Sequence, residues 1–264
     1  IFGSNDLKHP GVDYLFNTAG DFYLGGSVIG IKPPVHYDFI NKRYSPNGLK
    51  KYFKKMGWKK IIAFQTRSLL HRAQQELTLK AAKNNKANLL IHPVVGMTKP
   101  GEIDHFTKVR CYNAVLNYYP SGMTELSLLS LAMRMAGPRE AIWHGLIRKN
   151  HGCTHLILAE DEFGPNLNTK QEPFYDPHDT KTLFHKHQAE MGIKMVDFES
   201  MVYVKELDRY EPIEKVTNKP LTKLDISGRE LGKLLDEGLE IPNWFSFPEV
   251  ISELRKVRPA RELQ

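Results

Sequence analysis

The sequence has little cysteine and no long apolar run. Its 264 residues include two cysteines, Cys111 and Cys153, and neither lies in a CxxC pair or at a spacing typical of metal ligands. A disulfide-stapled miniprotein is therefore excluded, and a zinc site is not indicated. Apolar runs stay well below the roughly 18 residues that a membrane-spanning helix requires, and mean hydropathy is −0.43. We expect a soluble cytoplasmic protein with no membrane partner.

The positive charge is not concentrated in one part of the sequence. Lysine plus arginine number 37 against 30 aspartate plus glutamate, which gives a net charge of +7. The basic residues are scattered, apart from a lysine-rich, helix-like segment at 50–60 that we interpret as a solvated helix face. No pattern resembles a nucleic-acid-binding signature, so nucleic acid is not an expected partner. An anionic small molecule remains compatible with the charge.

Alternating apolar runs and helical patterns predict an α/β fold. Runs typical of buried strands cover 60–64, 88–92 and 154–158, and helical patterns reach to about 85 and cover about 108–118 and 141–150. This order predicts a mostly parallel sheet with helices on both faces. We also expect short strands at 22–24 and 28–29, and a small C-terminal helical lobe with a helix at about 229–237.

Two segments follow predicted strands at the sheet edge where ligands of such folds bind. The first rim, residues 65–71, offers Gln65, Arg67, Ser68 and His71 at the start of a helix. A helix N-terminus, a guanidinium and an imidazole together suit a phosphate or another oxyanion. Ordinary surface residues on a strand-to-helix turn account for the spacing equally well. The second rim is the segment 159–165.

Residues 63–74 read AFQTRSLLHRAQ, and this string resembles the signature of the ATP sulfurylase family, whose usual form is AFQTRNPxHRAH. Further segments resemble that family in the same order, so the resemblance covers nearly the whole chain. These segments are 98–103, 109–112, 133–141, 201–204, 226–228 and 240–250. Residues 1–31 resemble the end of the family's N-terminal barrel-like domain, most of which is absent here.

The resemblance implies a Rossmann-like nucleotidyltransferase that transfers AMP from ATP to sulfate and releases pyrophosphate. Mg²⁺ would accompany the ATP, with no metal site of the protein's own. The implied domains are a remnant of the N-terminal domain with its linker at 1–48, the catalytic domain at 49–205 and a small C-terminal domain at 206–264. ATP and a small acceptor are the implied partners, and a homo-oligomer is left open.

The resemblance also implies roles for individual residues of the first rim. Gln65 and Arg67 match the family's sulfate-contacting pair, with Thr66 and Ser68 beside them, while His71 matches the first histidine of its phosphate-binding motif. Gln74 stands where the second histidine is usual; it can form hydrogen bonds but cannot carry a positive charge. Catalytic roles are expected for Arg67, His71 and Gln74. Nucleotide contacts are expected from His71, Gly137, Arg139, Met201, Val202 and Ser227.

The second rim departs from the family's usual GRDHAGPG. Glu160 replaces the arginine, Asp161 is retained, and Phe163 replaces the alanine; all three are expected to face the acceptor. Two charges about 4 Å apart at an effective dielectric of about 20 interact by roughly 4 kcal/mol, so Glu160 would oppose a dianionic acceptor. The acidic run Glu160 to Glu162 is also a weaker candidate for binding Mg²⁺.

Three interpretations stay open at this point. The chain adenylylates sulfate in spite of the altered rim, or it transfers AMP to a different small acceptor. Alternatively, it is a nucleotide-binding paralogue without turnover.

Overall fold

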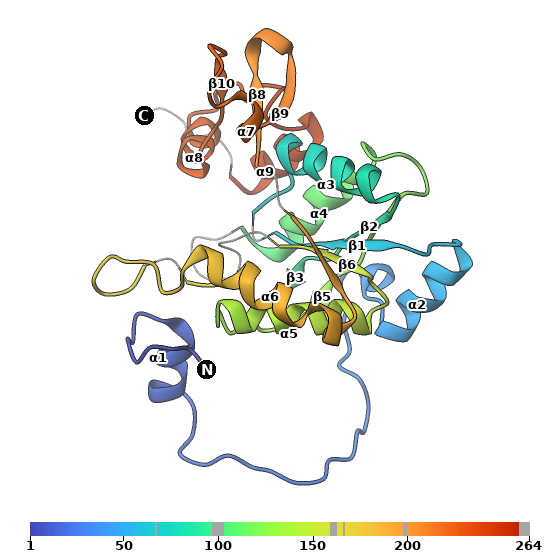
Figure 1. Ribbon diagram of the computed structural model, residues 1–264, viewed down its shortest axis with the longest axis vertical. Helices are drawn as coiled ribbons and strands as arrows, with labels where there is room; N and C mark the ends of the chain where they lie inside the picture. The colour runs from blue at the N-terminus through green and yellow to red at the C-terminus, as the bar shows by residue number, and fades with distance from the viewer. Residues whose placement is uncertain (67, 97–102, 159–162, 166, 198–199, 259–264) are drawn as a thin grey trace.

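A five-stranded parallel sheet forms the centre of the molecule (Figure 1). The structure, a computed structural model, describes residues 1–258 except 67, 97–102, 159–162, 166 and 198–199. The strand order is β4-β2-β1-β6-β7, and every neighbouring pair is parallel. The strands are β1 (Ile61–Phe64), β2 (Asn88–Ile91), β4 (Thr124–Leu126), β6 (His155–Ile157) and β7 (Lys194–Val196). The predicted α/β class is confirmed.

The winding of this sheet reverses between β1 and β6. From β1 the chain adds β2 and β4 on one side, whereas β6 and β7 lie on the other side. In open α/β sheets, ligands bind outside the carboxyl ends of the strands at this reversal. The chain leaves β1 at Gln65 and β6 at Leu158, so the segments that carry the two rims begin at the expected ligand position.

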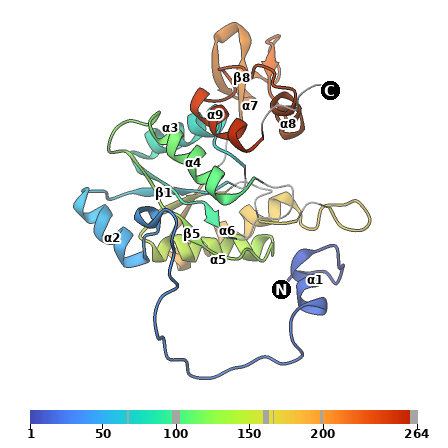
Figure 2. The same ribbon diagram turned by 180° about the vertical axis from the view of Figure 1, so that it is seen from behind.

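Helices cover both faces of the sheet, as expected (Figures 1 and 2). Side chains alternate along a strand, and in β1 Ile62 and Phe64 belong to the core shared with α3 and α4, while Ile61 and Ala63 belong to the core shared with α2, α5 and α6. Gln65 continues this alternation and falls on the same side as Ile61 and Ala63. These helices are α2 (Pro46–Lys55), α3 (Arg72–Asn85), α4 (His105–Leu116), α5 (Pro138–Asn150) and α6 (Pro177–Met191).

The C-terminal lobe contains a small sheet in addition to the expected helices. Its antiparallel order is β10-β8-β9, and α8 and α9 pack with α3 and α4 in one core. The lobe comprises β8 (Met201–Val204), β9 (Arg209–Pro212), α7 (Ile213–Val216), β10 (Lys223–Leu224), α8 (Gly228–Asp236) and α9 (Pro248–Val257). A domain boundary after residue 205 would separate β8 from its partner β9; the division into domains stays a prediction.

The prediction of strands at 22–24 and 28–29 is wrong. Between α1 (Pro10–Asn17) and the 3-10 turn η1 (Ile40–Lys42) the chain has no strand, and it loops away from the sheet (Figure 2). Leu24 and Val28 are exposed at 101% and 93%. Apolar runs favour strands only where a neighbouring strand accepts their hydrogen bonds, and here none lies alongside. Among the described residues, no helix has the length and apolar character needed to cross a membrane.

Candidate functional site

Gln65, the first residue after β1, turns its side chain into a buried polar cluster on α5. Its Oε1 accepts a hydrogen bond from the Arg148 guanidinium and lies 3.0 Å from His144 Nδ1. His144 Nε2 lies 3.1 Å from a carboxylate oxygen of Glu140. All four side chains are buried, with Arg148 and His144 at 0% exposure. We call Glu140, His144, Arg148 and Gln65 the relay.

One protonation pattern fits the relay best. Burial, together with the charge of Arg148, lowers the pKa of His144, which favours the neutral imidazole. Nε2–H then donates to Glu140, and Nδ1 accepts from Arg148 Nη1 at 2.9 Å. Gln65 Oε1 and His144 Nδ1 are both acceptors that share the guanidinium. Glu140 and Arg148 are thus linked through the neutral imidazole of His144. Their opposite charges compensate each other, as buried charges require.

Glu140 also holds the loop that enters α5. Its carboxylate accepts from the backbone N–H of Arg134 at 3.1 Å and from that of Ala136 at 3.5 Å. The loop continues to Gly137, whose N–H donates to the Phe163 carbonyl at 2.9 Å. The second rim is therefore tied to the same helix as Gln65.

Gly137 and Phe163, both predicted to be site residues, lie together at this junction. Gly137 has a φ of +58°, and a Cβ there would lie 2.5 Å from the ring of Tyr175, so the position requires glycine. The Phe163 ring is 3% exposed and packs edge-on against His144 at 5.1 Å. Its side chain contributes to the core on the α5 face, which leaves the ring inaccessible to an acceptor.

His71 lies on the opposite face of the sheet from the relay. Its Nδ1 is 2.8 Å from Ser246 Oγ, and its ring packs on Phe245 at 4.5 Å. Burial lowers its pKa to about 4. At neutral pH the ring is therefore uncharged, and it can meet a phosphate oxygen as a hydrogen-bond donor rather than as a cation.

Gln74 serves as a cap for α3. Its Oε1 accepts from the His71 backbone N–H at 3.1 Å, which stabilises the first turn of the helix. The Arg72 N–H donates to the Phe245 carbonyl at 3.1 Å. The C-terminal lobe thus already occupies part of the helix N-terminus that the sequence suggested as a phosphate site.

The backbone of the first rim is held from α4. Tyr112 Oη donates to the Ser68 carbonyl at 3.0 Å, and the Ser68 N–H donates to Thr66 Oγ1 at 3.1 Å. The Ser68 side chain is exposed and is therefore accessible to a ligand.

The remaining predicted nucleotide contacts are dispersed. Arg139 is exposed in the first turn of α5. Met201 and Val202 belong to β8 in the C-terminal lobe, and the Ser227 hydroxyl caps α8 by accepting from the Glu230 N–H at 3.2 Å. The structure does not join these residues into one cluster with Gly137, and their assignment as site residues stays a prediction.

Arg67, Glu160 and Asp161 lie outside the described residues, as does Glu162. Elsewhere in the described part of the chain, no group of three or more His, Cys, Asp or Glu side chains is arranged to hold a metal ion.

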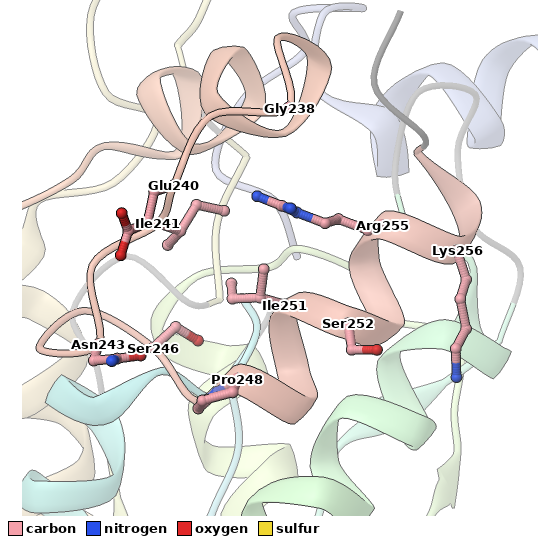
Figure 3. Close-up of a pocket in the computed structure, with 10 residues that line it drawn as sticks. All are labelled: Gly238, Glu240, Ile241, Asn243, Ser246, Pro248, Ile251, Ser252, Arg255 and Lys256. Carbon is pink, nitrogen blue, oxygen red and sulfur yellow. The ribbon is translucent and has the colours of Figure 1, made fainter.

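A pocket of about 700 Å³ opens in the C-terminal lobe (Figure 3). Arg255 projects into it from α9, opposite Glu240, and donates to the Leu239 carbonyl at 2.7 Å. Ser246, the partner of His71, contributes to its wall, whereas the predicted site residues do not. The lining residues are Gly238, Glu240, Ile241, Asn243, Ser246, Pro248, Ile251, Ser252, Arg255 and Lys256.

Of the relay, only Gln65 is among the site residues predicted from the sequence, and Ser246 is not predicted either. Glu140, His144 and Arg148 recur every four residues, which places them on one face of a helix. A helix face that carries three polar residues yet packs against a sheet is a detectable signal. Ser246 left no such signal, because its partner His71 is 175 positions away.

Comparison with known proteins agrees with this architecture. The ATP-sulfurylase family model matches residues 41–257. Proteins named sulfate adenylyltransferase are 53% identical over the whole chain in Phaeosphaeria nodorum, 52% over 98% of it in Gibberella zeae, and 51% over the whole chain in Schizosaccharomyces pombe. The chain covers 46%, 45% and 54% of these proteins, about half their length.

A solved structure shares the fold. It is titled hexameric APS kinase from Thiobacillus denitrificans, and it superposes with a TM-score of 0.73 at 33% identity, over 88% of this chain and 43% of that one. With a family model that matches most of its length and relatives about half identical throughout, this chain belongs to the ATP-sulfurylase family.

Proposed function

We propose that the chain transfers AMP from ATP to sulfate and releases pyrophosphate. The observation that carries the proposal is the position of Gln65, whose carbonyl oxygen is held by Arg148 beside the reversal of the sheet. This leaves the amide N–H groups as the donors available to an oxyanion. The named relatives, about 50% identical, favour sulfate over a different acceptor or a paralogue without turnover.

The reaction needs positioning and charge stabilisation rather than a covalent intermediate. A sulfate oxygen attacks the α-phosphorus of ATP, and the bond from that phosphorus to the oxygen bridging to the β-phosphate breaks. Pyrophosphate leaves with the electron pair. Gln65 and Arg67 would hold the sulfate, and neutral His71 would donate to a phosphate oxygen. Mg²⁺ would enter with the ATP as part of the substrate, through phosphate oxygens.

We further propose a reducing cytoplasm as the location of the protein. Cys111 and Cys153 are both buried and form no disulfide, which suits a compartment that keeps thiols reduced. Self-association stays a proposal that size-exclusion chromatography with light scattering would decide.

The test is pyrophosphate release from ATP and Mg²⁺ with and without sulfate, with a conventional ATP sulfurylase as positive control. Sulfate-dependent release supports the proposal, and Arg67→Ala is expected to abolish it. Release that is unaffected by sulfate would indicate another acceptor. ATP binding without any release would favour the paralogue without turnover.

A further inference from the structure

We propose that Arg148 is a positioning residue that gives the acceptor site its preference for oxyanions by fixing the orientation of the Gln65 amide. The inference rests on the proposed function and names a residue through which that function would acquire its substrate class. Arg148 itself is 0% exposed and is not expected to touch the acceptor.

The side-chain amide of Gln65 has two chemically different ends. Gln65 can present either its carbonyl oxygen or its NH₂ group to a ligand, and only the NH₂ group attracts an anion. Arg148 Nη2 donates to Gln65 Oε1 and also to the His92 carbonyl, the latter at 3.1 Å. The reversed amide would place NH₂ against a guanidinium that has only donors. Arg148 therefore disfavours the orientation that would repel an anion.

The amide nitrogen of Gln65 can donate hydrogen bonds that the described residues do not fully accept. Among the residues that the structure describes, the acceptor within reach of Gln65 Nε2 is the thioether of Met133 at 3.9 Å. Thioether sulfur is a weak acceptor, and Gln65 is only 6% exposed. A buried amide N–H with so weak a partner is costly, and an oxyanion at the carboxyl end of β1 would relieve that cost.

The other relay members fix Arg148 in turn. Its Nη1 donates to His144 Nδ1 at 2.9 Å, and His144 is held by Glu140. Glu140 accepts from the backbone of the loop that also carries Met133 and Gly137. The amide of Gln65, the loop entering α5 and, through Gly137, the second rim are therefore positioned by one set of contacts.

The experiment compares Arg148→Lys with Lys149→Met in the full chain. Lysine keeps the buried charge but cannot donate in a planar fork to several acceptors at once, whereas Lys149 is exposed on the same helix. For Arg148→Lys we expect the KM for sulfate to rise about 10-fold and the KM for ATP to change by less than about twofold. Lys149→Met should change neither. A parallel rise in both KM values would indicate a general structural role and overturn the proposal.

A double-mutant cycle separates positioning from fold maintenance. If Arg148 acts through Gln65, then Arg148→Lys should not raise the KM for sulfate further in a Gln65→Met background. Multiplicative effects of the two substitutions would overturn the proposal. Circular dichroism and thermal unfolding establish that each variant is folded. Should Arg148→Lys fail to fold, Gln65→Glu replaces it, since a carboxylate keeps the Arg148 contact but removes the amide donors. Loss of sulfate dependence in Gln65→Glu is expected, and sulfate dependence that survives without these donors would overturn the proposal.

Sulfate binding distinguishes failure of this inference from failure of the proposed function. Stabilisation of the folded chain by sulfate, measured against chloride at equal ionic strength, does not require turnover. A wild-type chain that binds sulfate but releases no pyrophosphate contradicts the proposed function alone, and Arg148→Lys should still weaken the stabilisation. If Arg148→Lys binds sulfate as well as the wild type, the inference is wrong. A wild-type chain that does not bind sulfate overturns both.

Discussion

His71 Nδ1 lies 2.8 Å from Ser246 Oγ, and both side chains are buried. This contact joins the N-terminus of α3, directly after the first rim, to the loop that leads into α9 of the C-terminal lobe. The Arg72 N–H donates to the neighbouring Phe245 carbonyl at 3.1 Å, so the loop contacts the helix at two adjacent points. The lobe is therefore attached to the first rim by polar contacts as well as by its apolar core.

Ser246→Ala is expected to destabilise the fold by about 1–3 kcal/mol, because a buried imidazole nitrogen loses its hydrogen-bond partner. Urea unfolding at neutral pH measures the change. Ser252→Ala, on an exposed part of α9, is the matched control and should cost little. Equal effects of the two substitutions would show that the His71 contact contributes nothing.

The buried His71 ring should make stability depend on pH. Its pKa is lowered by burial from 6.5 to about 4, so below pH 6.5 the unfolded chain binds a proton that the folded chain does not. Acid therefore favours unfolding, and the loss grows as the pH falls from about 6.5 to about 4, reaching about 3 kcal/mol.

Unfolding free energies of the wild type and His71→Asn across this range measure that loss. The difference between the two proteins should shift in favour of the variant as the pH falls. The exposed His185 provides the control. The difference in unfolding free energy between His185→Asn and the wild type should stay constant across the same pH range. A pH-independent difference between wild type and His71→Asn would contradict the assignment.

Gly137→Ala should be more damaging than Gly122→Ala. Both glycines have positive φ, +58° and +71°, but a Cβ at Gly137 would lie 2.5 Å from the Tyr175 ring while one at Gly122 meets nothing within 4 Å. The strain alone costs about 1–2 kcal/mol, and displacement of the ring adds to it at Gly137. Thermal unfolding of both variants gives the comparison. Equal melting temperatures would show that displacement of the Tyr175 ring does not lower the stability of the fold.

The sheet was predictable because its strands are short apolar runs between clear helical patterns. The runs at 60–64, 88–92 and 154–158 became β1, β2 and β6, and the position of both rims followed from the rule for parallel sheets. The same reasoning wrongly predicts a strand at 22–24, because an apolar run does not reveal whether a neighbouring strand exists.

The interior of the candidate site was harder to predict than its location. Gln65 is a predicted acceptor-binding residue, but its contact with Arg148 depends on a separation of 83 positions that no local pattern encodes. His71 was expected beside phosphate, and its low pKa arises from burial by Phe245 and Ser246 of a distant lobe. Local motifs identify such residues, whereas their protonation and orientation depend on tertiary packing.

The charge at position 160 should govern the affinity for sulfate. Glu160→Arg replaces a negative charge by a positive one in the second rim, and at about 4 Å and an effective dielectric of about 20 each charge interacts with an anion by roughly 4 kcal/mol. We therefore expect the KM for sulfate to fall at least about 10-fold, with little change for ATP. The control is Glu190→Arg, which makes the same charge change at an exposed position on α6 and tests for long-range steering, which added salt would screen. If both substitutions improve sulfate use alike, or if Glu160→Arg leaves sulfate dependence unchanged, residue 160 does not face the acceptor.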